Sequence, residues 1–184
     1  MVKHITMEQL QAGLVDVGQS PKDKGTVAMI VARPDVDERL TPDSAEFDVS
    51  EGLLGDNWRL LGSSMTDDGS AHPDMQIAII NKRFVELIAG ERDRWPLAGD
   101  QLVLDLDITH ENLQTGQQLA IGSTVLEITE VPHKGCKKFA ERFGKDVITF
   151  VTSDVGMNWR ARGIYAKVVR AGTINVGDSV SKIG

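Results

Sequence analysis

Predicted strands follow one another directly in the second half of the chain, and this order constrains the fold most strongly. Apolar residues alternate from 101 to 108, so that Leu102, Leu104 and their i+2 successors share one face. Residues 118–121 and 124–131 flank Gly122-Ser123, which predicts a two-residue hairpin turn. A doubly wound sheet would need helices between its strands. We therefore expect a mainly β, α+β fold, either an antiparallel β-barrel or a sandwich, with short helices.

Other segments predict the remaining elements. Short apolar runs typical of buried strands occupy residues 26–32 and 75–80. Helical spacing of apolar residues predicts short helices over residues 7–17, 82–89, 136–143 and 146–152. Residues 165–169 and 173–180 predict a final strand pair, joined at Ala171-Gly172. The total expected is six to eight strands and three or four helices.

The stretch from residue 34 to residue 74 has no regular periodicity and predicts a long loop. Loops of this length inside a domain are usually functional or disordered. Its first part, residues 34–51, is acidic, and we consider the hypothesis that it closes over a site as a lid. A chain of 184 residues suits one domain. We expect an N-terminal arm with a short helix over residues 1–25 and a barrel domain over residues 26–184.

Composition and missing motifs exclude several functional classes. A net charge of −7 and 5% aromatic residues argue against nucleic-acid binding, and no apolar run is longer than six residues, which argues against a membrane span. The N-terminus has no apolar signal segment, and a single cysteine suits a reducing compartment, so we expect a cytoplasmic protein. The sequence has no phosphate-binding loop, dinucleotide fingerprint or zinc-like His spacing, and we expect no NAD, nucleotide or zinc.

Cys136 is the strongest candidate for chemistry. It lies in the segment His133-Lys134-Gly135-Cys136-Lys137-Lys138, where a strand region meets a predicted helix. Nearby cations and a helix N-terminus stabilise a thiolate, the form that attacks electrophiles, carries a persulfide or ligates a soft metal. The alternative is that Cys136 is a small buried core residue.

Three further segments contain candidate binding residues. Gly55-Asp56 and the loop around His72 are each explained by turn chemistry alone, so a binding role there needs other support. Arg160 and Arg162 place two cations on one side of an extended chain, where they can hold a phosphate or carboxylate. A solvated basic edge is an equally good interpretation of that pair.

Taken together, these segments resemble the MOSC domain, a family named after the C-terminal domain of molybdenum cofactor sulfurase. The resemblance covers residues 26–182 and depends on five pieces in the family's order. These are Gly52-Leu53-Leu54-Gly55-Asp56, then His72-Pro73-Asp74-Met75-Gln76, then Glu111-Asn112-Leu113 with Gly116 and Leu119-Ala120-Ile121-Gly122, then Cys136, and last Arg162-Gly163-Ile164-Tyr165-Ala166 with Gly172 and Val176-Gly177-Asp178. The resemblance implies an antiparallel or mixed β-barrel and a role with the molybdenum cofactor.

The resemblance also implies roles for individual residues. Cys136 would ligate molybdenum or carry sulfur as a persulfide, and some relatives reduce N-hydroxylated compounds with a partner electron donor; a sulfur carrier would instead need a sulfur-donor protein. Cofactor-binding candidates are Arg160, Arg162 and Lys137 for the pterin phosphate, and the motif residues Asn112, Asp56 and His72. Pyridoxal phosphate is a family-level association only, because we see no aminotransferase-like segment to bind it. The rival hypothesis is a non-catalytic barrel that binds an anionic ligand or a protein.

Overall fold

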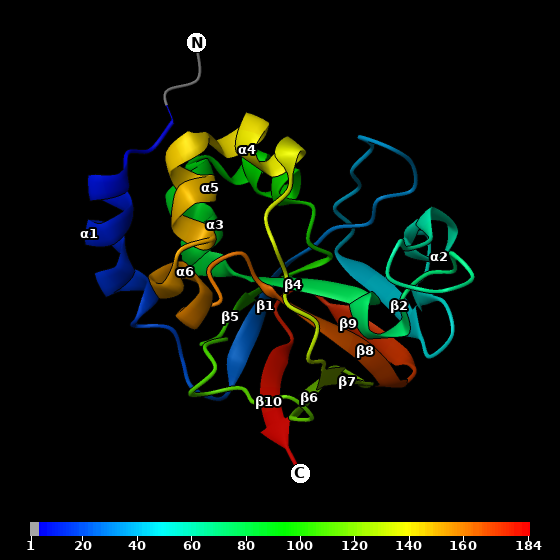
Figure 1. Ribbon diagram of the computed structural model, residues 1–184. Helices are drawn as coiled ribbons and strands as arrows, with labels where there is room; N and C mark the ends of the chain where they lie inside the picture. The colour runs from blue at the N-terminus through cyan, green and yellow to red at the C-terminus, as the bar shows by residue number, and fades with distance from the viewer. Residues whose placement is uncertain (1–3) are drawn as a thin grey trace.

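In the part of the chain that the computed structural model describes, residues 4–184, seven strands close into a β-barrel (Figure 1). The strands are β1 (Gly25–Ile30), β2 (Ser44–Asp48), β3 (Gly52–Leu53), β4 (Ile77–Asn81), β5 (Leu102–Asp105), β6 (Gln118–Ile121), β7 (Thr124–Ile128), β8 (Ile164–Arg170), β9 (Gly172–Asn175) and β10 (Ser179–Ile183). The barrel order is β1-β10-β6-β7-β8-β4-β5, and β3-β2-β9 form a separate small sheet.

Short helices connect and cover these strands. They are α1 (Met7–Val17), α2 (Trp58–Leu61), α3 (Lys82–Ala89), α4 (Lys137–Phe143), α5 (Lys145–Val151) and α6 (Asp154–Asn158), with 3-10 helices η1 (Pro73–Met75) and η2 (Arg92–Ala98). The expected helix over residues 82–89 is confirmed, and those near 136–143 and 146–152 are confirmed within a residue. Figure 1 shows α1, α3, α4, α5 and α6 gathered over one side of the barrel, with α2 on the other side.

The strand pairing confirms a mixed barrel. The predicted hairpin pairs β6 with β7 and places Ile121 opposite Thr124. Strands β4 and β5 pair in parallel, because α3 and η2 carry the chain back between them, and the other neighbours in the barrel are antiparallel. The barrel fold expected from the sequence is therefore confirmed.

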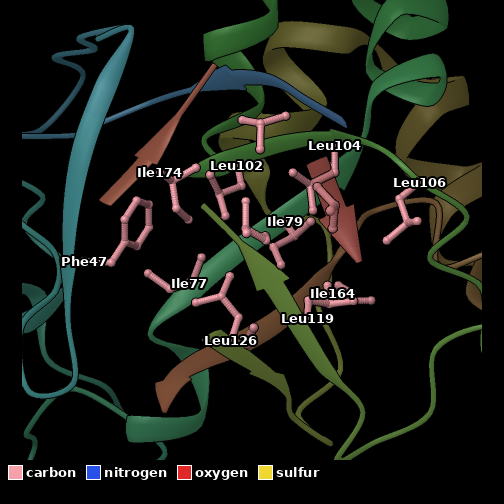
Figure 2. Packing of buried hydrophobic residues seen from close by; sticks show 14 of the residues in the cluster. Phe47, Ile77, Ile79, Leu102, Leu104, Leu106, Leu119, Leu126, Ile164 and Ile174 are labelled. Carbon is pink, nitrogen blue, oxygen red and sulfur yellow. The ribbon is translucent and has the colours of Figure 1, made fainter. Parts of the chain in front are cut away.

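Alternating side chains of the strands fill the barrel. Ile77, Ile79, Leu102 and Leu104 point inward and are fully buried in one cluster (Figure 2). Their neighbours Ile80 and Val103 belong to a second cluster between the barrel and the helices. Strands β4 and β5 are thus buried on both faces, which explains why residues 77–80 form a continuous apolar run.

Helix α1 belongs to this second cluster. Thr6 and Gln9 form a reciprocal capping box at its N-terminus, and Leu10 is fully buried beside the other helices. The backbone N–H of Met7 donates to the Asp146 carboxylate over 3.0 Å. The first helical turn is thereby tied to α5.

Two sequence predictions are wrong. The stretch 34–74 is not one long loop, since it contains β2, β3 and α2, and β2 pairs with β9. The expected pairing of residues 165–169 with 173–180 does not form. Strand β8 pairs with β4 and β7, while residues 173–180 divide into β9 and β10, which join different sheets. Strand β2 pairs with β9 more than a hundred residues later, and the residues that pair with β8 are 38 or more positions away, as Ile128 is from Ala166. Local patterns carry no information over such distances. Within residues 4–184 there are ten strands and six α-helices, more than expected.

Candidate functional site

Cys136 occupies the N-cap position of α4, and its side chain is exposed. The helix is held in place by Phe139 and Phe143, which are buried against the barrel-side helices. The thiol makes no capping hydrogen bond. The interpretation of Cys136 as a buried core residue is therefore wrong, because the fold buries the helix and leaves the thiol accessible.

The thiol lines a cleft of about 400 Å³ between α4 and α2. Six cationic side chains share the lining, and no Asp or Glu of residues 4–184 does: Arg33, Arg39, Lys134, Lys138, Arg142 and Arg162. They come from three separate segments, residues 33–39, residues 134–142 and residue 162, that the fold brings together. In a chain with a net charge of −7, this concentration of positive charge makes the cleft a candidate site for an anionic ligand.

Three carboxylates outside the cleft lining neutralise part of this charge. Asp37 accepts from Lys138 Nζ over 3.0 Å and from Arg142 over 2.8 Å. Asp56 pairs with Arg33, as described below, and Asp100 pairs with Arg162.

Arg39 and Lys134 have no ion pair within residues 4–184, and the single charge of Asp37 is shared by two cations. The cleft therefore keeps an excess of positive charge, most of it on Arg39 and Lys134. Burial lowers the pKa of the Arg39 guanidinium, and the charges of Arg142 and Arg33 lower it further. Cations held this close together favour an anion between them.

Asp56 supports the cleft from behind. Its carboxylate is about 1% exposed and accepts from Arg33 Nε over 2.9 Å, from Arg33 Nη2 over 2.7 Å and from the Trp58 backbone over 3.0 Å. The Gln101 side chain also donates to it over 3.2 Å. The predicted turn at Asp56 thus orients a guanidinium that faces the cleft, while the carboxylate itself is fully occupied.

A buried cluster forms the other wall. Arg162 donates through Nη1 to both oxygens of Asp100 over 3.0 and 2.8 Å, and its guanidinium lies 4.5 Å from the centre of the Phe139 ring. The His133 ring lies 4.2 Å from that of Tyr165. Burial lowers the pKa of His133 well below its ordinary 6.5, with Arg162 and Arg33 adding to the effect, so His133 is neutral.

Tyr165 is neutral as well. Burial raises its pKa to about 12, while the charge of Arg162 opposes this rise and that of Asp100 adds to it. A neutral phenol that lines the cleft together with the thiol is a hydrogen-bond donor for an anionic ligand.

The structure brings together only part of the predicted set of residues. Cys136, Arg162 and His72 line the cleft, the last with Nδ1 accepting from the Asp74 backbone. Lys137 is about 92% exposed outside the lining and pairs with Glu141. Asn112 lies outside the cleft lining. Its side-chain nitrogen donates to the backbone carbonyls of Lys22 and Asp107, and its side-chain oxygen accepts from Lys182 Nζ.

The expectation that Arg160 and Arg162 lie on one side of an extended chain is wrong. The chain at Arg160 is not extended, because this residue has a left-handed φ of 47° in the turn after α6. Its Nη1 donates to the carbonyls of Ile108 and Leu113. Of the two, only Arg162 lines the Cys136 cleft, whereas both arginines line a second cavity beside it.

Sequence reasoning missed several lining residues. Arg33, Arg39 and Arg142 are more than 100 residues apart at the extremes, and no local motif links them. Tyr165 lies in the last of the matching motifs, but nothing in its local sequence indicates that it lines a cleft. The one available signal was Arg33, which ends a predicted strand directly before Pro34.

No three or more His, Cys, Asp or Glu side chains of residues 4–184 form a cluster able to hold a metal ion. Cys136 can offer one soft thiolate ligand to a metal. Over the same residues, no helix combines the length and apolar character needed to cross a bilayer.

Comparison with known proteins identifies the family. No curated protein matches the chain. The fold is similar to the crystal structure of the YUAD protein from Bacillus subtilis, with a TM-score of 0.59 and 16% identity over 85% of this chain and 94% of that one. It is also similar to YiiM from Escherichia coli, with a TM-score of 0.56 and 16% identity over 86% of this chain and 70% of that one. YiiM from Geobacillus stearothermophilus is similar as well, with a TM-score of 0.56 and 15% identity over 87% of this chain and 75% of that one.

At these identities the structures establish the fold alone. The sequence pattern of the MOSC domain matches residues 66–181, which include Cys136, Arg162 and Tyr165. The match spans more than half of the chain, and the barrel agrees with the fold expected of the family. This chain belongs to the MOSC domain family.

Proposed function

We propose that the cleft binds the molybdenum cofactor and that Cys136 is a ligand of its molybdenum. The observation that carries the proposal is an exposed thiol inside a cleft lined by six cationic side chains. A soft metal needs a thiolate, and a pterin phosphate needs cations. The cleft offers both within one volume of about 400 Å³, a size typical of cofactor sites.

The two groups of cations have different roles in this proposal. Arg39 and Lys134 have no ion pair within residues 4–184 and would hold the phosphate. Arg33 and Arg162 are fixed by buried carboxylates and so keep their charges in place before the ligand arrives. This preorganisation lowers the cost of ordering on binding. Tyr165 would donate a hydrogen bond to the bound cofactor, and the molybdenum would supply redox chemistry.

The test is the molybdenum and pterin content of protein purified from a host that makes the cofactor. Near-stoichiometric molybdenum in the wild type and its loss in Cys136→Ser support the proposal. Arg39→Gln combined with Lys134→Gln is expected to lower the pterin content. Lys137→Gln is the matched control, because Lys137 neighbours Cys136 but lies outside the cleft lining.

Two results would replace the proposal. Molybdenum and pterin retained in Cys136→Ser would favour a persulfide carrier, which a sulfane-sulfur assay on the wild type would then detect. A wild-type protein without cofactor would favour the non-catalytic module that binds another anion or a protein. Reduction of N-hydroxylated compounds, the electron-donor or sulfur-donor partner and a cytoplasmic location stay predictions.

A further inference from the structure

A second cavity lies beside the Cys136 cleft. It has a volume of about 490 Å³, and its lining shares His133, Lys134 and Arg162 with the cleft. The shared residues make a common wall, so a ligand in the second cavity lies next to the proposed cofactor site. Cavities of this volume suit a small organic molecule.

The lining of this cavity differs from that of the cleft. Apolar side chains from the loop before α4, from α5, α6 and β8 provide much of its surface: Val131, Pro132, Val151, Met157 and Ile164. Positive charge comes from Lys134, Arg160 and Arg162, and the one carboxylate among the lining residues is Glu130. Asp100 already neutralises Arg162, so in protein without cofactor Lys134 and Arg160 against Glu130 leave an excess of one positive charge. An apolar body with a single anionic group fits this combination.

Arg160 is the residue best placed to receive the anionic group. Its backbone has a left-handed φ of 47°, a conformation that costs free energy and that clusters at functional sites. Only Nη1 of its guanidinium bonds to protein, at the carbonyls of Ile108 and Leu113. Within residues 4–184 the other guanidinium nitrogens have no hydrogen-bond partner, and they remain available to a ligand.

The common wall contains two unsatisfied polar atoms. Nδ1 of His133 and Nε of Arg162 are buried without a hydrogen-bond partner in residues 4–184. A buried polar atom without a partner is costly, and such atoms in a native structure often mark a ligand or a solvent position. Both residues belong to the lining of both cavities.

We infer that this second cavity binds a small organic carboxylate with an apolar body, with its carboxylate at Arg160, as the substrate pocket of the Cys136 site. The role as substrate pocket rests on the proposed function, whereas carboxylate binding does not. Binding is therefore measured on protein without cofactor. Failure of cofactor retention and failure of carboxylate binding are then separate results.

The experiment uses benzoate as the probe and benzamide as its uncharged counterpart. Titration calorimetry at low ionic strength is expected to show benzoate binding and at least tenfold weaker benzamide binding, because a hydrogen bond to a charged group is worth about tenfold or more in affinity. Amide NMR shifts are expected at His110, Gly156 and Gly163, which line or adjoin the cavity, and not at Gly99 of the Cys136 cleft.

Two variants of Met157 make the test independent of Arg160, whose substitution would also release the Ile108 and Leu113 carbonyls. Met157 is about 51% exposed, so it tolerates polar replacement. Met157→Glu is expected to weaken benzoate binding several-fold through charge repulsion, and Met157→Gln is its neutral control. Equal binding of benzoate and benzamide, equal affinities of the two variants, or shifts confined to the Cys136 cleft would each overturn the inference.

Discussion

Acidification will destabilise the folded protein through His133. The His133 side chain is about 6% exposed, and its pKa is held well below 6.5 by burial and by the nearby charges of Arg162 and Arg33. Asp100 lies 3.5 Å from His133 Nδ1 but is already paired with Arg162 at 2.8 Å, so it does not restore the charge on the imidazole. Folded protein therefore carries a neutral His133.

The sign and size of the effect follow from proton linkage. In unfolded chains a histidine takes up a proton near pH 6.5, whereas in the folded protein His133 does not. Below that pH the unfolded state binds more protons, so the free energy of unfolding falls as the pH falls. The loss approaches about 1.4 kcal/mol for each pH unit between about 6.5 and the folded pKa. Above about pH 7 His133 is neutral in both the folded and the unfolded state, so it no longer makes the free energy of unfolding depend on pH.

The measurement is urea unfolding followed by the fluorescence of the three tryptophans, at several pH values between about 7 and 5.5. His133→Gln removes the titrating group. Between about pH 6.5 and pH 5.5 its free energy of unfolding is expected to fall by about 1 kcal/mol less than that of the wild type. His110→Gln is the matched control, because His110 is exposed and its pKa is lowered less. The same pH slope in wild type and His133→Gln would refute the reasoning, and so would a wild type that gains stability on acidification.

Three further predictions concern the ion pairs and the core. Asp100→Asn leaves the Arg162 charge buried without its partner and is expected to cost about 3–5 kcal/mol in urea unfolding, more than Asp100→Leu combined with Arg162→Met; equal costs would contradict this. Asp37→Asn frees Lys138 and Arg142 and is expected to raise the affinity of the cleft for inorganic phosphate about fivefold at low salt, an increase that high salt abolishes. Leu104→Ala empties part of the barrel interior and should cost about 2–5 kcal/mol, and a loss below 1 kcal/mol would show a looser core than Figure 2 suggests.

Local chemistry in the sequence was enough to identify many elements of the fold. Gly122-Ser123 between two apolar segments determines the β6–β7 hairpin, because a two-residue turn sets the register of the strands it joins. Asn81 and Gly90 bound α3 for similar reasons, as Asn81 caps the Phe84 N–H and Gly90 takes the positive φ at the end of the helix. The sequence also placed Cys136 at the start of a helix, although it left open whether the thiol is buried or exposed.

Tertiary structure decided what the sequence could not. The partner of β2 is β9, more than a hundred residues later, and pairing over that distance depends on how the barrel closes. The cleft has the same origin, because Arg33 and Arg39 meet Cys136 only when the segment after β1 crosses to α4, where Asp37 of that segment pairs with Arg142. The sequence by itself determined turns, caps and alternating faces, which depend on neighbours along the chain. Whether a cation lines the cleft like Lys134 or points to solvent like Lys137 depends on contacts between distant segments, and only the folded chain determines those.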